Sequence, residues 1–161
     1  MSENEKQENE KQANREFYEK KIKESKGQWQ AIVDDLTSRL RDDIKGVIDV
    51  QAEAISHRQS VVDEINIYSV KVWKLVQKIK VLSKGRFEFY ATSYQVKTSG
   101  TEKLRLIEAD LSEYQLFINI IDEYVSFLRD TSKNLDAINY SVKSKIELTN
   151  ILGGYKWECR Y

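Results

Sequence analysis

Apolar side chains recur at alternating steps of three and four residues between Leu104 and Ile146, and this period constrains the fold more than any other feature. A period of this kind is that of an α-helix that packs along one face. The chain contains no proline, where average usage would give about eight, so nothing of that kind interrupts long helices. The sequence predicts an all-α protein: an elongated helical hairpin or bundle with a long heptad-patterned C-terminal helix over 102–152.

Local signals mark the ends of this long helix. Residues 99–102, Ser-Gly-Thr-Glu, have the pattern of a capping box at its start, and Gly153-Gly154 is expected to end it. The polar residues 130–134 are a place where it could bend or break. A helix over 102–151 would be about 75 Å long at about 1.5 Å per residue. We therefore expect it to pack on helices formed by residues 31–84, on copies of itself, or on both.

The long stripe is expected to pair helices of different copies in a homo-oligomer with a coiled-coil seam. The residues assigned to oligomerisation are Leu104, Ile107, Leu111, Ile118, Ile121, Val125, Leu128, Leu135, Val142 and Ile146. Ser132 and Asn139 are polar positions of the same stripe. Polar residues at such positions either fix register and subunit number at a cost in stability, or simply lie on an exposed face.

A polar segment opens the chain. The pattern Glu-Asn-Glu-Lys-Gln at 3–7 is repeated at 8–12, and almost no apolar residue precedes Phe17. Such a segment cannot bury enough surface to offset the entropy lost on ordering. We expect 1–28 to be a low-complexity, flexible tail, with 1–14 disordered or a frayed, solvated helix. This tail either keeps the chain soluble or binds a partner.

Two shorter apolar stripes follow and predict helices over 29–84, either continuous or with a short break. The first stripe is Trp29, Val33, Leu36, Leu40, Ile44 and Val47, and the second is Val61, Ile65, Tyr68, Val72, Val76 and Ile79. Gly85 is a plausible C-cap. The helical domain is expected to span 29–154, with a basic and aromatic hinge at 85–101 and a C-terminal tail at 155–161.

The composition argues against several classes of protein. The single cysteine, Cys159, forms no internal disulfide, and the start of the chain has no apolar stretch of the kind found in a secretory signal. His57 is expected on the surface. No phosphate-binding loop or metal-ligand spacing is present. We expect a cytoplasmic protein that is not an enzyme and that uses no cofactor, no metal and no membrane.

The charge of the chain is balanced, with 26 basic and 26 acidic residues, but it is unevenly distributed. Residues 65–100 contain seven basic residues and one acidic residue, Glu88, whereas acidic residues predominate in 31–64 and 101–130. A partner responds to local charge, because salt screens the field beyond about 8–10 Å. The basic segment is therefore the candidate for binding a polyanion.

Basic and aromatic side chains lie close together in this segment. The candidate DNA-binding residues are Lys71, Lys74, Lys78, Lys80, Lys84, Arg86, Phe89 and Tyr90. Cations contact the phosphates of a single strand while rings stack on its bases, at about 1–3 kcal/mol each. No base-reading motif accompanies them, so we expect binding without sequence preference. The alternative interpretation is a solvated lysine face whose aromatic residues belong to the core.

Residues 84–90, Lys-Gly-Arg-Phe-Glu-Phe-Tyr, resemble the Lys-x-Arg-x-acidic-aromatic-aromatic motif of the UvsY-type recombination mediators of T-even-like bacteriophages. Further elements follow in the order of that family: Ile-Glu-Ala-Asp at 107–110, Tyr-Ser-Val-Lys at 140–143 and a closing Gly154. The resemblance covers roughly residues 50–154. The N-terminal residues have no counterpart, and Ile138-Asn139 stands where the family often has Arg-Gly.

The resemblance implies a small helical protein that assembles into a ring of six or seven subunits and binds single-stranded DNA. It implies that the protein helps to load a phage recombinase onto strands coated by single-strand-binding protein, in the host cell cytoplasm, during recombination, replication and repair. Lys84 and Arg86 occupy the positions of the family's DNA-contacting basic pair.

A protein of a different class explains the heptads, the missing proline and the polar tail equally well. It would be a structural coiled-coil assembly protein of a virion or a secretion apparatus. Such a protein would have no affinity for nucleic acid at about 100 mM salt.

Overall fold

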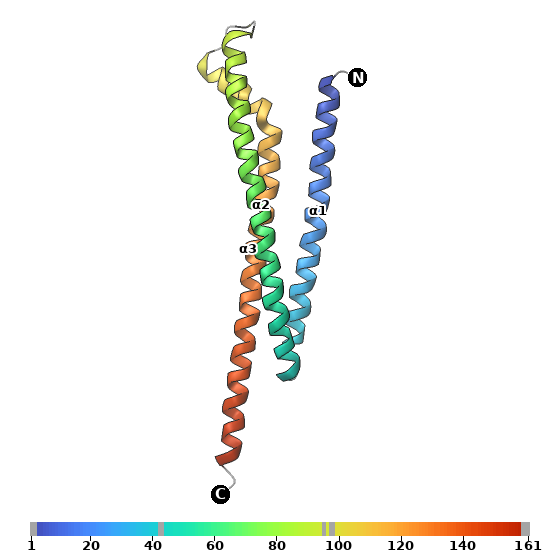
Figure 1. The fold of residues 1–161 in the computed structure, drawn as a ribbon, viewed down its shortest axis with the longest axis vertical. Helices are drawn as coiled ribbons and strands as arrows, with labels where there is room; N and C mark the ends of the chain where they lie inside the picture. Colours follow the sequence, from blue (N-terminus) through green and yellow to red (C-terminus); the bar gives the residue numbers. More distant parts are fainter. Residues whose placement is uncertain (1–2, 42–43, 95, 97–98, 159–161) are drawn as a thin grey trace. The chain divides into compact units, whose positions relative to one another are not determined.

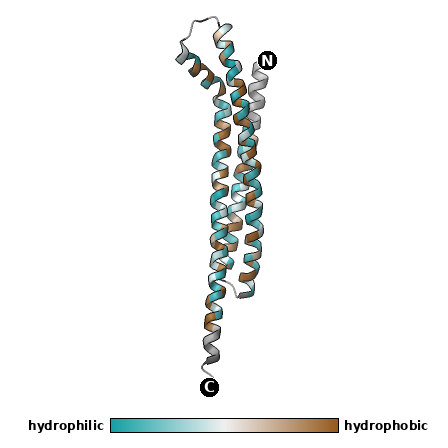
Figure 2. Cartoon of the chain, turned by 60° about the vertical axis from the view of Figure 1, so that its left-hand side comes forward, coloured by the Kyte–Doolittle hydropathy of each residue, from teal (hydrophilic) through white to brown (hydrophobic). Residues whose placement is uncertain are grey.

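The computed structural model describes residues 3–41, 44–94, 96 and 99–158, with side chains described for 15–41, 45–94, 96 and 99–152. All regular structure in these ranges is helical: α1 (Glu3–Arg39), α2 (Ile44–Thr92) and α3 (Gly100–Glu158) (Figure 1). The predicted all-α class is therefore confirmed. Apolar and polar residues alternate along each helix (Figure 2), as expected where each helix packs along part of its surface.

The helices form two compact units, and every helix contributes to both. Unit 1 comprises Met1–Glu19 and Asn66–Val125, and unit 2 comprises Lys20–Ile65 and Ser126–Tyr161. Each unit has its own buried side chains, so the two are described separately.

Unit 2 joins α1, α2 and α3 through a buried apolar core and several polar contacts. The buried core residues are Ile22, Leu36, Val47, Val50, Ala54, Val61, Leu128, Leu135, Ile138 and Val142. Arg39 donates from both terminal guanidinium nitrogens to the carboxylate of Glu53, each at 2.7 Å, which lowers the pKa of Glu53. The ammonium of Lys145 donates to the carbonyl oxygen of Leu40 at 3.0 Å, which satisfies an acceptor freed at the end of α1.

Unit 1 is held by aromatic as well as aliphatic packing. Tyr68 of α2 and Tyr124 of α3 are both buried and meet edge to face, with ring centroids 4.9 Å apart. Tyr18 of α1 packs against Phe117 of α3, with centroids 5.1 Å apart. The candidate DNA-binding residues all lie on the α2 part of this unit.

The capping box at 99–102 is confirmed. The backbone N–H of Ser99 donates to Oε2 of Glu102 at 2.7 Å, and the N–H of Glu102 donates to the Ser99 hydroxyl at 3.3 Å. α3 begins at Gly100, directly after Ser99. The bond from the Ser99 backbone lowers the pKa of the Glu102 carboxyl.

Several predicted helix limits are wrong. The first apolar stripe is divided between α1 and α2, because both arms of the hairpin turn their apolar residues to one core and the period does not reveal the turn. Gly85 is not a C-cap, since α2 continues to Thr92 and no described glycine has a positive φ. α3 likewise continues past Gly153-Gly154 to Glu158.

Two further expectations concern polar segments. Residues 130–134 do not interrupt α3, because Thr131 is buried and its hydroxyl donates to the Phe127 carbonyl at 3.0 Å, within the helix. For 1–28, expected to be a tail, the structure gives helix from Glu3 onward, in keeping with the high helix propensity of its Glu, Lys, Gln and Ala residues.

The residues assigned to oligomerisation mostly lie inside the chain itself. The buried ones are Ile107, Leu111, Ile118, Ile121 and Val125 in unit 1, and Leu128, Leu135 and Val142 in unit 2. Ile146 is half-buried, and Leu104 remains 56% exposed. The stripe therefore packs against other helices of the same chain, and its buried members leave no surface for a second copy in this conformation. Ser132 and Asn139 are half-buried.

Candidate nucleic-acid interface

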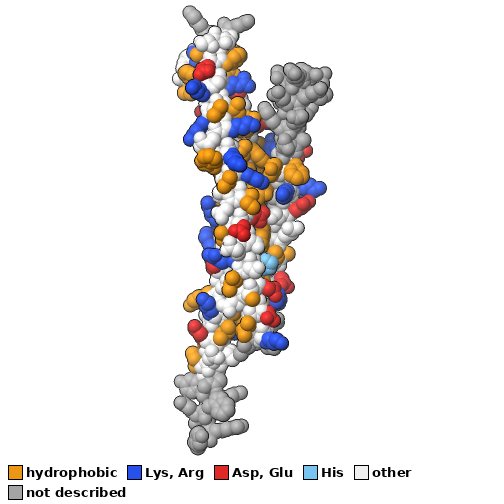
Figure 3. Space-filling model, viewed as in Figure 1, with side chains coloured by type: hydrophobic (Ala, Val, Ile, Leu, Met, Phe, Trp, Pro, Cys, Tyr) orange, Lys and Arg blue, Asp and Glu red, His pale blue; other side chains and the backbone are white. Residues whose placement is uncertain are grey.

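The predicted binding residues occupy the C-terminal half of α2 but differ in exposure. Lys74, Lys78, Lys80, Lys84, Arg86 and Phe89 are exposed, Lys71 is half-buried and Tyr90 is buried. Figure 3 shows basic and hydrophobic side chains interspersed over the surface where this half of α2 lies. Most of the predicted cations are therefore accessible to a ligand.

The exposed cations do not form a single patch. Lys71, Lys74 and Lys78 share one side of α2, and Phe89, eighteen residues after Lys71, returns to it after about five turns. We call these four residues the Lys71 flank. Lys80 lies nine residues after Lys71, or about two and a half turns, and so points to the opposite side.

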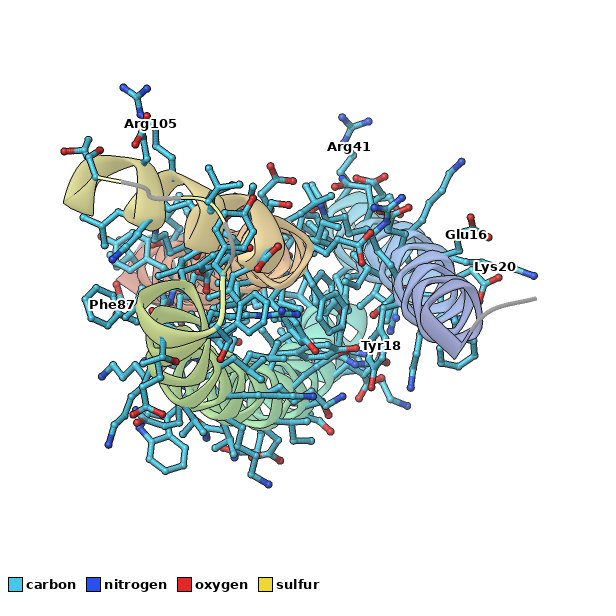
Figure 4. All side chains as sticks on the ribbon, turned by 90° about the horizontal axis from the view of Figure 1, so that it is seen from above. Glu16, Tyr18, Lys20, Arg41, Phe87 and Arg105 are labelled. Carbon is cyan, nitrogen blue, oxygen red and sulfur yellow. The ribbon has the colours of Figure 1, made fainter. Side chains whose placement is uncertain are left out.

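Two lysines of the Lys71 flank, Lys71 and Lys78, contact aromatic rings. The Lys71 ammonium lies 4.6 Å from the ring centroid of Tyr68 and 5.1 Å from that of Tyr18, which is directed toward α2 and α3 (Figure 4). The Lys78 ammonium lies 5.2 Å from the ring of Tyr114. Such cation–π contacts hold the two ammonium groups close to the rings.

The opposite side carries exposed aromatic rings that were absent from the predicted set. Trp73 lies seven residues before Lys80, and Phe87 lies three residues after Lys84, so these four residues share a side. Trp73 is 61% exposed and Phe87 is 50% exposed, and Phe87 projects outward from α2 (Figure 4). We call them the Trp73 flank. Their spacing relative to the lysines was the signal available in the sequence.

Tyr90, one of the predicted DNA-binding residues, is buried and presents little ring surface on which a base could stack. Its ring is 9% exposed and packs in a cluster with Ile107 and Leu111 of α3. Its hydroxyl donates to Oδ2 of Asp110 at 2.9 Å, and this bond, together with burial, raises the pKa of Tyr90. The sequence alternative, in which aromatic residues of this segment belong to the core, therefore holds for Tyr90.

Phe89 lies at the edge of a small aromatic cluster. Its ring meets those of Tyr90 and Tyr94 edge to face, at centroid distances of 5.3 and 6.2 Å. It nevertheless remains 42% exposed, so one part of the ring is available for a ligand.

Arg86 differs from the exposed lysines because a carboxylate from another helix approaches it. Its Nε lies 3.4 Å from Oδ2 of Asp110, the same oxygen that accepts the Tyr90 hydroxyl. The Arg86 side chain is half-exposed. A phosphate would have to share or replace this carboxylate.

No three His, Cys, Asp or Glu residues among those that the structure describes come together to hold a metal ion. A groove of about 670 Å³ in unit 1 is lined by apolar and neutral polar side chains, with Glu108 as its ionisable group. His57, expected on the surface, is half-buried and packs edge-on to Trp29, with centroids 6.1 Å apart.

Comparisons with protein-family models, with curated proteins and with solved structures found no match to this chain. Over the part of the chain that the structure describes, no helix combines the length and the apolar content needed to cross a membrane.

Proposed function

We propose that this protein binds single-stranded DNA without sequence preference and acts as a recombination mediator, helping to load a recombinase onto strands coated by single-strand-binding protein. One observation carries the proposal: between Trp73 and Phe89, α2 combines accessible cations with accessible rings on both of its flanks, and Glu88 is the only acidic residue of this stretch. The order of motifs shared with the UvsY-type mediators supplies the biological role. The proposal includes no catalytic step and no cofactor.

The Trp73 flank is the stronger half of the proposed site. Lys80 and Lys84 supply charge for the phosphates, and the rings of Trp73 and Phe87 can stack on bases, a contact that tolerates any sequence. The Lys71 flank extends the positive surface around the helix and adds Phe89. A flexible single strand can follow both flanks, whereas a stiff duplex cannot bend as sharply.

We propose that binding is multiplied by self-association into a ring-like homo-oligomer. Because most of the long stripe is buried within the chain, the contact between copies must use other apolar residues. Ile67, Val70 and Val81 are exposed on α2 and share a side. Repeating a weak site around a ring raises its effective affinity.

The test is a titration of fluorescent oligo-dT with the wild-type chain and with Lys80→Ala/Lys84→Ala. Fluorescence anisotropy measures the binding at about 50 and 200 mM salt. We expect salt-sensitive binding that the double substitution weakens by at least about tenfold, with a shallower salt slope. The control is Lys20→Ala/Lys23→Ala, which removes two exposed cations of α1 in unit 2.

Two outcomes would contradict the proposal. Equal losses in the two double variants would show that only net charge matters and would remove the site. In the second outcome, light scattering shows an oligomer that does not bind oligo-dT at either salt concentration. That result would favour the structural coiled-coil assembly protein.

A further inference from the structure

Asp110 connects two residues of the segment that ends α2. Its Oδ2 accepts the Tyr90 hydroxyl at 2.9 Å and lies 3.4 Å from Nε of Arg86. Arg86 and Tyr90 are four residues apart and therefore neighbours on α2, whereas Asp110 belongs to α3. All three residues are part of unit 1.

We propose that Asp110 is a positioning residue that restrains Arg86 and competes with DNA phosphate for its guanidinium. The inference rests on the proposed function and identifies a residue that regulates DNA binding at the same site. In the free protein Arg86 is paired with Asp110. When a strand binds, a phosphate replaces the carboxylate, so that each binding event includes an exchange of anions at Arg86.

The contacts give the two bonds of Asp110 different strengths. Tyr90 is buried among Ile107 and Leu111, so its hydroxyl holds the carboxylate in a fixed place. The Arg86 pair is long and half-exposed, and exposed ion pairs of this kind contribute little to stability. A phosphate can therefore displace Asp110 from Arg86 while Asp110 keeps its bond to Tyr90.

In this arrangement, Asp110 lowers the affinity of the site for DNA. Its negative charge lies beside the site at which a phosphate must arrive, and like charges repel across this distance. Arginine forms two parallel bonds to phosphate, which its restrained geometry in the free protein opposes. The site is consequently weaker than its cations alone would make it, which suits a protein that must release its strand to another protein.

The decisive variant is Asp110→Asn. Asparagine keeps an oxygen that can accept the Tyr90 hydroxyl but removes the negative charge. We expect oligo-dT binding to tighten by about three- to tenfold at about 50 mM salt, with a salt slope steeper by about 0.7, equivalent to one further phosphate contact. Far-UV circular dichroism should report unchanged helix content.

Two comparisons separate this effect from a change in net charge. Asp122→Asn makes the same charge change at an exposed position of α3 in unit 1, twelve residues away, and should change affinity by less than about twofold. In a chain that already carries Arg86→Ala, adding Asp110→Asn should produce no gain, because the guanidinium that it would release is absent.

The outcomes distinguish this inference from the proposed function. If the wild-type chain binds oligo-dT but Asp110→Asn binds no tighter, the restraint on Arg86 is disproved and DNA binding stands. A gain that persists in the Arg86→Ala background, or one that Asp122→Asn reproduces, disproves it as well. Failure of every variant to bind oligo-dT at about 50 mM salt overturns both.

Discussion

At the scale of single residues, exposure divides the aromatic side chains of α2 into exposed rings and core rings. Trp73 and Phe87 present half or more of their surface beside lysines, whereas Tyr90 is buried against α3. Only the first kind can stack on a base. Chemical type alone therefore does not identify the residues of the site.

We predict that Trp73→Ala and Phe87→Ala each weaken oligo-dT binding by about tenfold, since one base–ring stack contributes about 1–3 kcal/mol. The measurement is an anisotropy titration at constant salt, with Tyr140→Ala as the control. Tyr140 is 74% exposed but lies on α3 in unit 2. An equal loss in the Tyr140 variant would mean that these rings act without regard to position.

The Tyr90–Asp110 bond predicts a dependence on alkaline pH. The raised pKa of Tyr90 means that folding favours its neutral form, so the bond stabilises the protein below pH 10 and this contribution is lost as the pH rises through the folded-state pKa. In an absorbance titration, the difference between wild type and Tyr90→Phe should show a tyrosine that ionises later than a free one. Asp110→Asn should move this ionisation to lower pH; an unchanged curve would contradict the assignment.

The sequence predicted the exposure of the cations in the proposed site better than that of its rings. Lys80 and Lys84 are exposed, as their charge requires, and so their accessibility follows from local chemistry. For Phe87 and Tyr90, three residues apart in one helix, the difference in burial depends on where Ile107 and Leu111 of α3 lie. No local pattern in α2 contains that information. The same holds for the approach of Asp110 to Arg86.

At the scale of elements, the start of α3 is the best-defined signal in the chain. Ser99→Ala should lower the free energy of unfolding by about 1 kcal/mol, the usual contribution of an N-cap, which corresponds to about 2–4 °C in Tm for a chain of this size. Thermal melts followed by circular dichroism measure this change. Ser112→Ala, at an exposed position within α3, is the control for loss of a serine hydroxyl.

The same cap predicts a dependence on acidic pH. Because the folded-state pKa of Glu102 is lowered, its contribution is present above about pH 4.5 and is lost as the pH falls through the folded-state value. The destabilisation caused by Glu102→Gln should therefore be seen at neutral pH and shrink in acid. A difference that stays constant from neutral pH to acid would contradict the ionic part of the cap.

Element ends without such a local bond could not be predicted. The period of three and four continues from Leu36 to Val47 although α1 ends between them, since both residues are buried in the core of unit 2 from opposite arms of a hairpin. The glycines caused the opposite error, because they predicted helix ends where the helix continues. An added Cβ at Gly85 would meet nothing within 4 Å, so neither crowding nor a left-handed backbone explains a glycine there, and the helix simply continues.

At the scale of the whole molecule, the apolar period predicted burial correctly but not the partner that provides it. A stripe such as that of α3 can be covered by a second copy or by other helices of the same chain, and the spacing is identical in the two cases. The structure covers Leu135 within unit 2 and leaves Val81 of unit 1 73% exposed. These two residues therefore distinguish folding from assembly.

Leu135→Ala should destabilise the fold by about 2–5 kcal/mol through the cavity that it creates, without changing the subunit count of the chains that remain folded. Val81→Asp should leave helix content and Tm nearly unchanged, because the side chain is exposed, but should dissociate the proposed oligomer by placing a charge in an apolar contact. Light scattering and thermal melts on both variants measure the two effects. If Leu135→Ala dissociates the oligomer and Val81→Asp does not, copies associate through the long stripe after all, and the contact proposed for α2 is wrong.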